Sequence, residues 1–160
     1  MNRIEVSQPI ERAPEAVFEV VEAFSRYPAY SKYLDAVSQV GTRDDLPEYA
    51  LSFSWWRLTY ETRTRVLDRD PPRTLDWEVA TDVDASGTWT VEPLGPDRAR
   101  LRLEARYDLD SIGSTGVSLP FGFSVNWLKR NVDDLISSEA DRVLARIAAN
   151  LEGQRSRSMT

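Results

Sequence analysis

The sequence of 160 residues contains no cysteine and no histidine. The absence of cysteine excludes disulfides and thiol nucleophiles, and the absence of both residue types excludes Cys/His zinc sites and acid–base catalysis by imidazole. Glycine is scarce, with seven residues, and none has the G-x-G-x-x-G spacing of a nucleotide-binding loop. An all-carboxylate metal site stays compatible with the sequence, but no D-x-D-x-D-G calcium loop is present. We therefore expect no metal ion and no cofactor, so any chemistry must come from Arg, Tyr, carboxylates and hydroxyls.

The chain also lacks an excess of positive charge and a long apolar run. Its net charge is −6 and its pI is about 4.8, which disfavours nucleic-acid binding because that requires a basic face. No segment of about 18 apolar residues is present, as a membrane-spanning helix would need, and the N-terminal residues alternate like a strand rather than resembling a signal peptide. We expect a cytoplasmic protein without nucleic-acid partners or integral membrane association, and leave its oligomeric state open.

What is present is a strong alternation of apolar and charged residues from Arg98 to Leu109. This period of two predicts a strand with one face in a core and the other in water. Weaker versions of the pattern, separated by turn formers such as Asp70-Pro71-Pro72 and Gly95-Pro96-Asp97, predict further strands at 3–10, 36–40, 49–55, 58–67, 74–80 and 87–91. Short breaks between successive strands indicate an antiparallel meander.

Helical spacing is found at three places. Residues 14–24 begin with a proline and place Val17, Val20, Val21 and Phe24 on one face, and residues 29–34 suggest a second short helix. A long apolar stripe predicts a helix over about 125–151, with Gly153 as a stop and 153–160 as a disordered tail. The expected fold is α+β: a curved antiparallel sheet of about seven strands around the long C-terminal helix, with two short helices after the first strand.

Four short motifs carry a resemblance to a known superfamily: I-x-R-A-P-E-A-V-F at 10–18, F-x-x-Y-P-x-Y at 24–30, T-R-V at 64–66 and G-T-W-T-V-E-P at 87–93. With the order of elements, they resemble the START-like helix-grip superfamily, in its polyketide cyclase/dehydrase and coenzyme Q-binding branch. The resemblance implies a single START-like domain over 1–152. It also implies a hydrophobic cavity between the sheet and the C-terminal helix, which holds an apolar or aromatic molecule.

The stretch FSWWRLTYETRTRV at 53–66 has two interpretations. By apolarity, Tyr60, Thr62, Thr64 and Val66 face inward and Arg65 faces water. Cyclase relatives instead place the arginine of T-R-V in the cavity, where Arg65 would polarise a ligand carbonyl. We expect the outer face, because the cyclase register would bury Glu61, Arg63 and Arg65 together, and buried charges are costly.

Several residues are candidates for a site. The alternation predicts burial of the aromatic ones on strands, and the resemblance implies that they share one cavity; the candidate ligand contacts are Tyr27, Tyr60, Thr62, Trp77, Trp89, Tyr107 and Leu128. For Tyr27 two roles stay open, a pocket mouth or a simple anchor of the helical turn. If the protein is an enzyme, Arg65 and Tyr60 are the catalytic candidates, although they lie on opposite faces of a regular strand.

Three functions are compatible with these patterns. The first, which we favour, is binding or transport of a small hydrophobic ligand (a lipid, a quinone or a polyketide-like molecule) without transforming it, because Tyr and Trp combine apolar surface with a polar group. The second is a polyketide cyclase or dehydratase. The third is a protein-interaction module, which a large exposed apolar patch would favour.

Overall fold

A computed structural model describes residues 2–43, 45–55, 58–79, 84–108 and 125–158, with some side chains in these ranges, notably those of 58–60, 125–133 and 154–158, left undescribed. The elements follow the order expected from the sequence: β1 (Asn2–Ile10), α1 (Pro14–Glu22), the 3-10 helix η1 (Phe24–Ala29), β2 (Leu34–Arg43), β3 (Leu46–Trp55), β4 (Leu58–Asp70), β5 (Thr74–Val79), β6 (Ala85–Gly95), β7 (Arg98–Tyr107) and α3 (Val125–Ser158).

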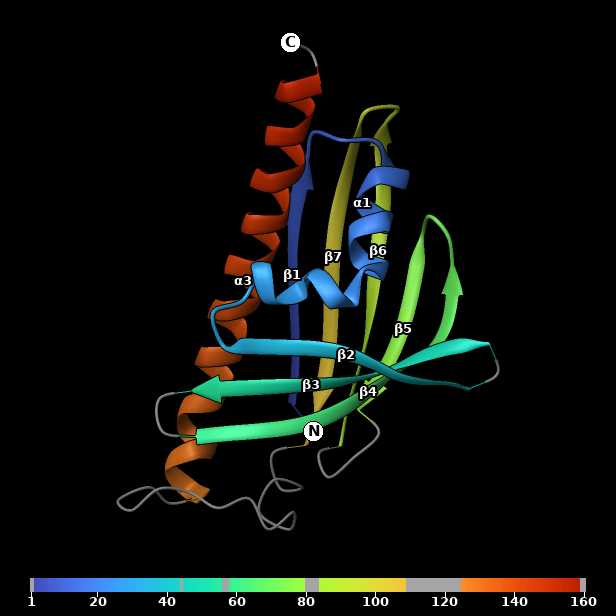
Figure 1. The fold of residues 1–160 in the computed structure, drawn as a ribbon. Helices are drawn as coiled ribbons and strands as arrows, with labels where there is room; N and C mark the ends of the chain where they lie inside the picture. The colour runs from blue at the N-terminus through green and yellow to red at the C-terminus, as the bar shows by residue number, and fades with distance from the viewer. Residues whose placement is uncertain (1, 44, 56–57, 80–83, 109–124, 159–160) are drawn as a thin grey trace.

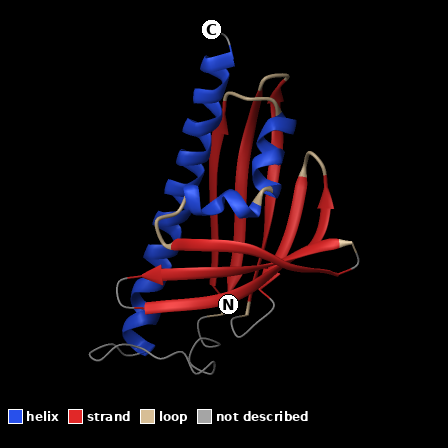
Figure 2. Ribbon diagram, viewed as in Figure 1, coloured by secondary structure: helices blue, strands red, loops and turns tan. Residues whose placement is uncertain are grey.

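The seven strands form one antiparallel sheet with the spatial order β1-β7-β6-β5-β4-β3-β2. From β2 to β7 each strand pairs with the next one in sequence, as short hairpins require. Strand β1 lies at the edge of the sheet and pairs with β7. The sheet bends so strongly that β2–β4 cross the direction of β1, β7 and β6 (Figures 1 and 2). This is the predicted helix-grip architecture.

The helices cover one face of the sheet, here called the inner face. Helix α3 packs along β1, and α1 lies over β6 and β7 (Figure 1). The buried core joins the three helices to the sheet and contains, among others, Val17, Val21, Phe24, Leu75, Val91, Leu101, Leu144, Ile147 and Leu151. In the described part of the chain, no helix has both the length and the apolarity needed to cross a membrane.

The second short helix differs from the prediction over 29–34. It is a 3-10 helix, η1, that starts directly after α1 and ends at Ala29. The next residues are attached to α3 instead of continuing the helix: Arg146 donates a hydrogen bond to the Tyr30 carbonyl (2.6 Å), and Ser31 donates one to Glu139 (3.2 Å). These contacts across the fold compete with local helical hydrogen bonding.

Helix α3 ends later than predicted, at Ser158 rather than near Leu151. Gly153 is therefore inside the helix and is not its stop. A glycine within a helix costs only about 1 kcal/mol relative to alanine, and the neighbouring Glu152, Gln154 and Arg155 are good helix formers.

Candidate functional site

The inner face of the sheet is built from rows of cross-strand partners. One row runs from Val66 on β4 through Trp77, Gly87 and Ala105 to Ile4 on β1. The next row on the same face joins Leu75, Trp89, Leu103 and Val6. At the inner positions of β5–β7, every described side chain is uncharged, because strict alternation sends the charged residues to the other face.

Thr62 and Thr64 add two hydroxyl groups to this face. Both side chains are buried, at 6% and 5% exposure, and they pair with Leu51 and Tyr49 of β3. Together with Val66 they establish the register of β4. The even-numbered residues of this segment point into the core, as their apolar pattern predicts.

Arg65 consequently lies on the outer face. Its guanidinium contacts the carboxylate of Glu78, its partner on β5, at 2.5 Å. The two side chains are 27% and 31% exposed, so they are partly covered rather than free in water. Tyr60 pairs with Phe53 of β3 and, unlike Arg65, occupies an even-numbered position of β4. The side chain of Tyr60 lies outside the described part of the structure. Of the two catalytic candidates, the structure thus describes the side chain of Arg65 alone, on the outer face.

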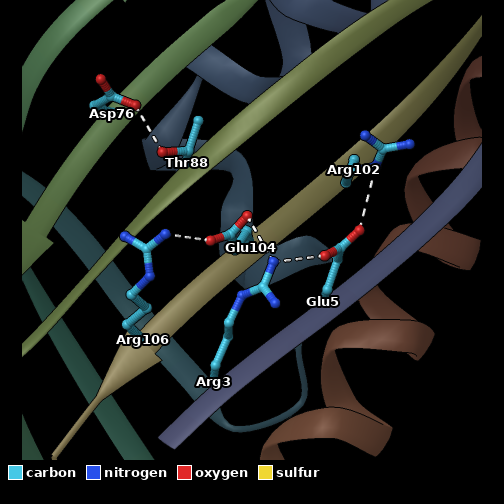
Figure 3. A network of polar contacts seen from close by, with 7 residues as sticks. All are labelled: Arg3, Glu5, Asp76, Thr88, Arg102, Glu104 and Arg106. Carbon is cyan, nitrogen blue, oxygen red and sulfur yellow. Dashed lines mark hydrogen bonds and ion pairs between the residues drawn. The ribbon is translucent and has the colours of Figure 1, made fainter. Parts of the chain in front are cut away.

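The outer face carries a network of ion pairs between β1 and β7, and beside it Thr88 of β6 donates a hydrogen bond to Asp76 of β5 at 2.7 Å (Figure 3). Glu104 binds both Arg3 (3.2 Å) and Arg106 (2.5 Å), and Arg102 contacts Glu5 (3.6 Å). Hydrogen bonding to Arg3 lowers the pKa of Glu104. The arginines and Glu5 are exposed and Glu104 is partly covered, so each pair contributes little stability individually. The charge of these strands is held away from the core.

An aromatic group joins η1 to the inner face of the sheet and is made of Phe24, Tyr27, Tyr49 and Trp89. Phe24 stacks on Tyr27 and on Tyr49, each at 4.7 Å between ring centroids, and Tyr27 meets Trp89 edge-on at 6.4 Å. The Tyr27 hydroxyl donates a hydrogen bond to the Val21 carbonyl at the end of α1. Burial raises the pKa of Tyr27 well above its usual value and also raises that of Tyr49. These contacts support the anchoring role for Tyr27, because its polar atom is already occupied.

Trp77 and Tyr107 lie in a second cluster further along the sheet. Tyr107 is buried with Ile4 and Ala105, and the partly buried Trp77 packs against this cluster as well as against the main core. Ile136 of α3 packs against the same cluster. The side chain of Leu128 falls outside the described residues. Of the predicted ligand contacts, the structure thus groups Tyr27 with Trp89, and Trp77 with Tyr107.

A polar cluster that sequence reasoning did not find links α3 to the segment after η1. Glu139 is buried on α3, contacts Arg146 (3.2 Å) and Arg142 (3.4 Å), and accepts a hydrogen bond from Ser31. The spacing of Glu139, Arg142 and Arg146 along one helix indicates a charged face. That this face turns inward toward Ser31 depends on packing and has no local signal.

A family model described as "Polyketide cyclase / dehydrase and lipid transport" matches residues 1–152. The chain belongs to this family. No protein of curated function matches the sequence.

Solved structures share the fold of this family member at low sequence identity. The Zhui aromatase/cyclase from Streptomyces sp. R1128 superposes with a TM-score of 0.76 at 15% identity, over 94% of this chain and 93% of that one. The protein TTHA0849 of Thermus thermophilus gives 0.75 at 14% identity, over 96% and 99%. A START superfamily protein from Mycobacterium smegmatis gives 0.67 at 15%, over 91% and 96%. These likenesses establish the START-like helix-grip fold.

Proposed function

We propose that this protein binds a small, uncharged, largely apolar ligand between the inner face of the sheet and α3. The observation that carries the proposal is the separation of charge across the sheet. The outer positions hold Arg65–Glu78 and the network of Figure 3, whereas the described inner positions of β5–β7 are apolar or aromatic. An apolar wall with a few hydroxyl and aromatic polar groups is typical of sites for hydrophobic small molecules.

The polar groups on the inner face of the sheet favour binding over acid–base chemistry, and the buried carboxylate of α3, Glu139, is already held by Arg142, Arg146 and Ser31. Thr62 and Thr64 are neutral at all working pH values, and burial raises the pKa of Tyr49, so that it stays a neutral phenol near pH 7. A general base must be within hydrogen-bond reach of its substrate and have a pKa near the working pH. Neither the threonines nor Tyr49 meets the second condition.

A cyclase or dehydratase is the second candidate, favoured by the description of the family and by the likeness to the Zhui aromatase/cyclase. Such an enzyme needs a group on the inner face that stabilises a developing oxyanion. Arg65 does not serve this purpose where it lies, because it is on the outer face with its charge paired to Glu78. We therefore place ligand binding first.

The proposal is tested by titrating the purified protein with the neutral fluorophore N-phenyl-1-naphthylamine. We expect saturable 1:1 binding with increased emission, because the probe leaves water for an apolar site. Two neighbouring substitutions distinguish the faces of β4: Thr62→Phe fills space on the inner face, whereas Glu61→Phe adds the same ring at an exposed position. Both variants are checked for native secondary structure by circular dichroism.

Weakening of probe binding at least tenfold in Thr62→Phe, with no change in Glu61→Phe, is the expected result. Equal effects of both variants, or no saturable binding by the wild type, would contradict an inner binding site. Native mass spectrometry of protein from its own host then identifies a co-purifying molecule by mass.

A further inference from the structure

The indole nitrogen of Trp77 is the one buried side-chain polar atom, within the described part of the chain, that has no hydrogen-bond partner. An indole N–H can only donate, and buried donors are almost always paired in natural proteins. Leaving one unpaired costs the full desolvation of the group. The unpaired N–H of Trp77 therefore points to a hydrogen-bond acceptor that is present when the protein carries out its function.

The surroundings of Trp77 favour a ligand atom over a water molecule as this acceptor. The ring packs against a cluster whose other members include Ile4, Ala105 and Ile136, which offer only hydrocarbon. A buried water makes about three hydrogen bonds to otherwise unsatisfied polar groups. Tyr107, the polar member of the cluster, already has an interaction of its own. One oxygen on an apolar ligand needs only the single bond that Trp77 provides.

The position of the indole is determined by the small residue opposite it. A Cβ atom added at Gly87 would lie 2.7 Å from Cε2 of Trp77, the ring atom bonded to the indole nitrogen, and would also collide with Cζ2. The six-membered ring of the indole thus packs directly on Gly87 through Cζ2 and Cε2, the latter being the atom that carries the nitrogen. A donor held in place in this way loses little freedom when a ligand binds, which favours affinity and selectivity.

We infer that the Trp77 indole N–H donates a hydrogen bond to an oxygen of the bound ligand, and that the site therefore selects apolar molecules carrying a carbonyl or similar acceptor over hydrocarbons of the same shape. This inference rests on the proposed binding function. It makes Trp77 a residue that determines specificity, whereas the aromatic group around Trp89 supplies apolar surface and support.

The test compares two tricyclic probes that differ by one oxygen, 9-fluorenone and fluorene. Dissociation constants are measured for the wild type, Trp77→Phe and Trp89→Phe. The wild type is expected to bind fluorenone about two- to tenfold more tightly than fluorene, the range of one net hydrogen bond. Trp77→Phe should abolish this ratio while still binding fluorene, and Trp89→Phe should keep the ratio whatever it does to the two affinities.

A second measurement avoids dependence on the folding of the variants. In the ¹H–¹⁵N spectrum of the wild type, which has five tryptophans, fluorenone should move one indole N–H signal downfield, and fluorene should not. Binding of both probes with equal affinity, or a preference that survives in Trp77→Phe, would overturn this inference alone. Binding of the naphthylamine but of neither tricyclic probe would also overturn this inference alone, whereas binding of none of the three would refute the proposed function as well.

Discussion

Replacing Gly87 by alanine tests the packing on which the inner face depends. Gly87 lies between Trp77 of β5 and Ala105 of β7 in one row of partners. An added Cβ would be 2.7 Å from both Trp77 Cε2 and the carbonyl oxygen of Glu104, where ordinary contacts begin at about 3.4 Å. The carbonyl is part of the backbone of β7, so the strands or the indole must move.

The expected cost follows from two opposing effects. Overpacking a well-filled site costs about 1–3 kcal/mol. Loss of backbone freedom in the unfolded chain offsets about 0.4–1 kcal/mol of this. The free energy of unfolding of Gly87→Ala should therefore fall by roughly 1–2 kcal/mol, which lowers Tm by about 2–8 °C for a chain of this size.

Gly41→Ala is the matched control, because Gly41 is also in a strand but has nothing within 4 Å of its added Cβ. This variant should be neutral or slightly stabilised, since only the unfolded-state effect remains. Urea denaturation followed by circular dichroism measures both, with the slope m checked for constancy. A Gly87→Ala protein as stable as the Gly41→Ala protein would refute the close contact between Trp77 and β6.

Three further substitutions test the polar contacts. Arg65→Ala should lower the free energy of unfolding by less than about 1 kcal/mol, because its pair with Glu78 is partly exposed; a double-mutant cycle with Glu78→Ala in thermal denaturation measures the coupling. Tyr27→Phe should cost about 1 kcal/mol through loss of the bond to the Val21 carbonyl. Because burial raises the folded-state pKa of Tyr27, its contribution is complete below pH about 10 and is lost as pH rises further; Tyr27→Phe should flatten this alkaline loss in a pH series of denaturation curves. Glu139→Gln should cost about 1–3 kcal/mol in urea denaturation, because it leaves arginines of α3 without their buried carboxylate.

The outcomes that would contradict these expectations are specific. A loss of about 3 kcal/mol or more for Arg65→Ala, the order found for a buried pair, would place its guanidinium in a buried setting. An unchanged alkaline profile in Tyr27→Phe would show that another group causes the loss. For Glu139, Arg142→Gln is the control: Arg142 is half exposed and should cost well under about 1 kcal/mol, so equal effects would contradict a central role for the carboxylate.

Much of the fold could be predicted from the sequence because its signals are local. Alternation over 98–107 assigns each side chain of β7 to a face whatever its partner strand is, and the same rule places Thr64 inside and Arg65 outside. Helical spacing in the C-terminal third predicts α3 in the same way. The absence of cysteine and histidine is equally independent of the structure, and it restricts the chemistry before any fold is considered.

The arrangement of the site was decided by contacts between residues far apart in the chain. That the indole of Trp77 rests on Gly87 and leaves its nitrogen unpaired depends on the register of β5 against β6 and on which small residues lie opposite. That Glu139 is buried beside Ser31 depends on how α3 docks against the segment after η1. A pattern of period two or 3.6 specifies which face of its element a side chain takes. The neighbours that the side chain meets on that face are set by the packing of the whole domain. The indole N–H of Trp77, proposed as the donor to the ligand, could therefore be found only in the tertiary structure.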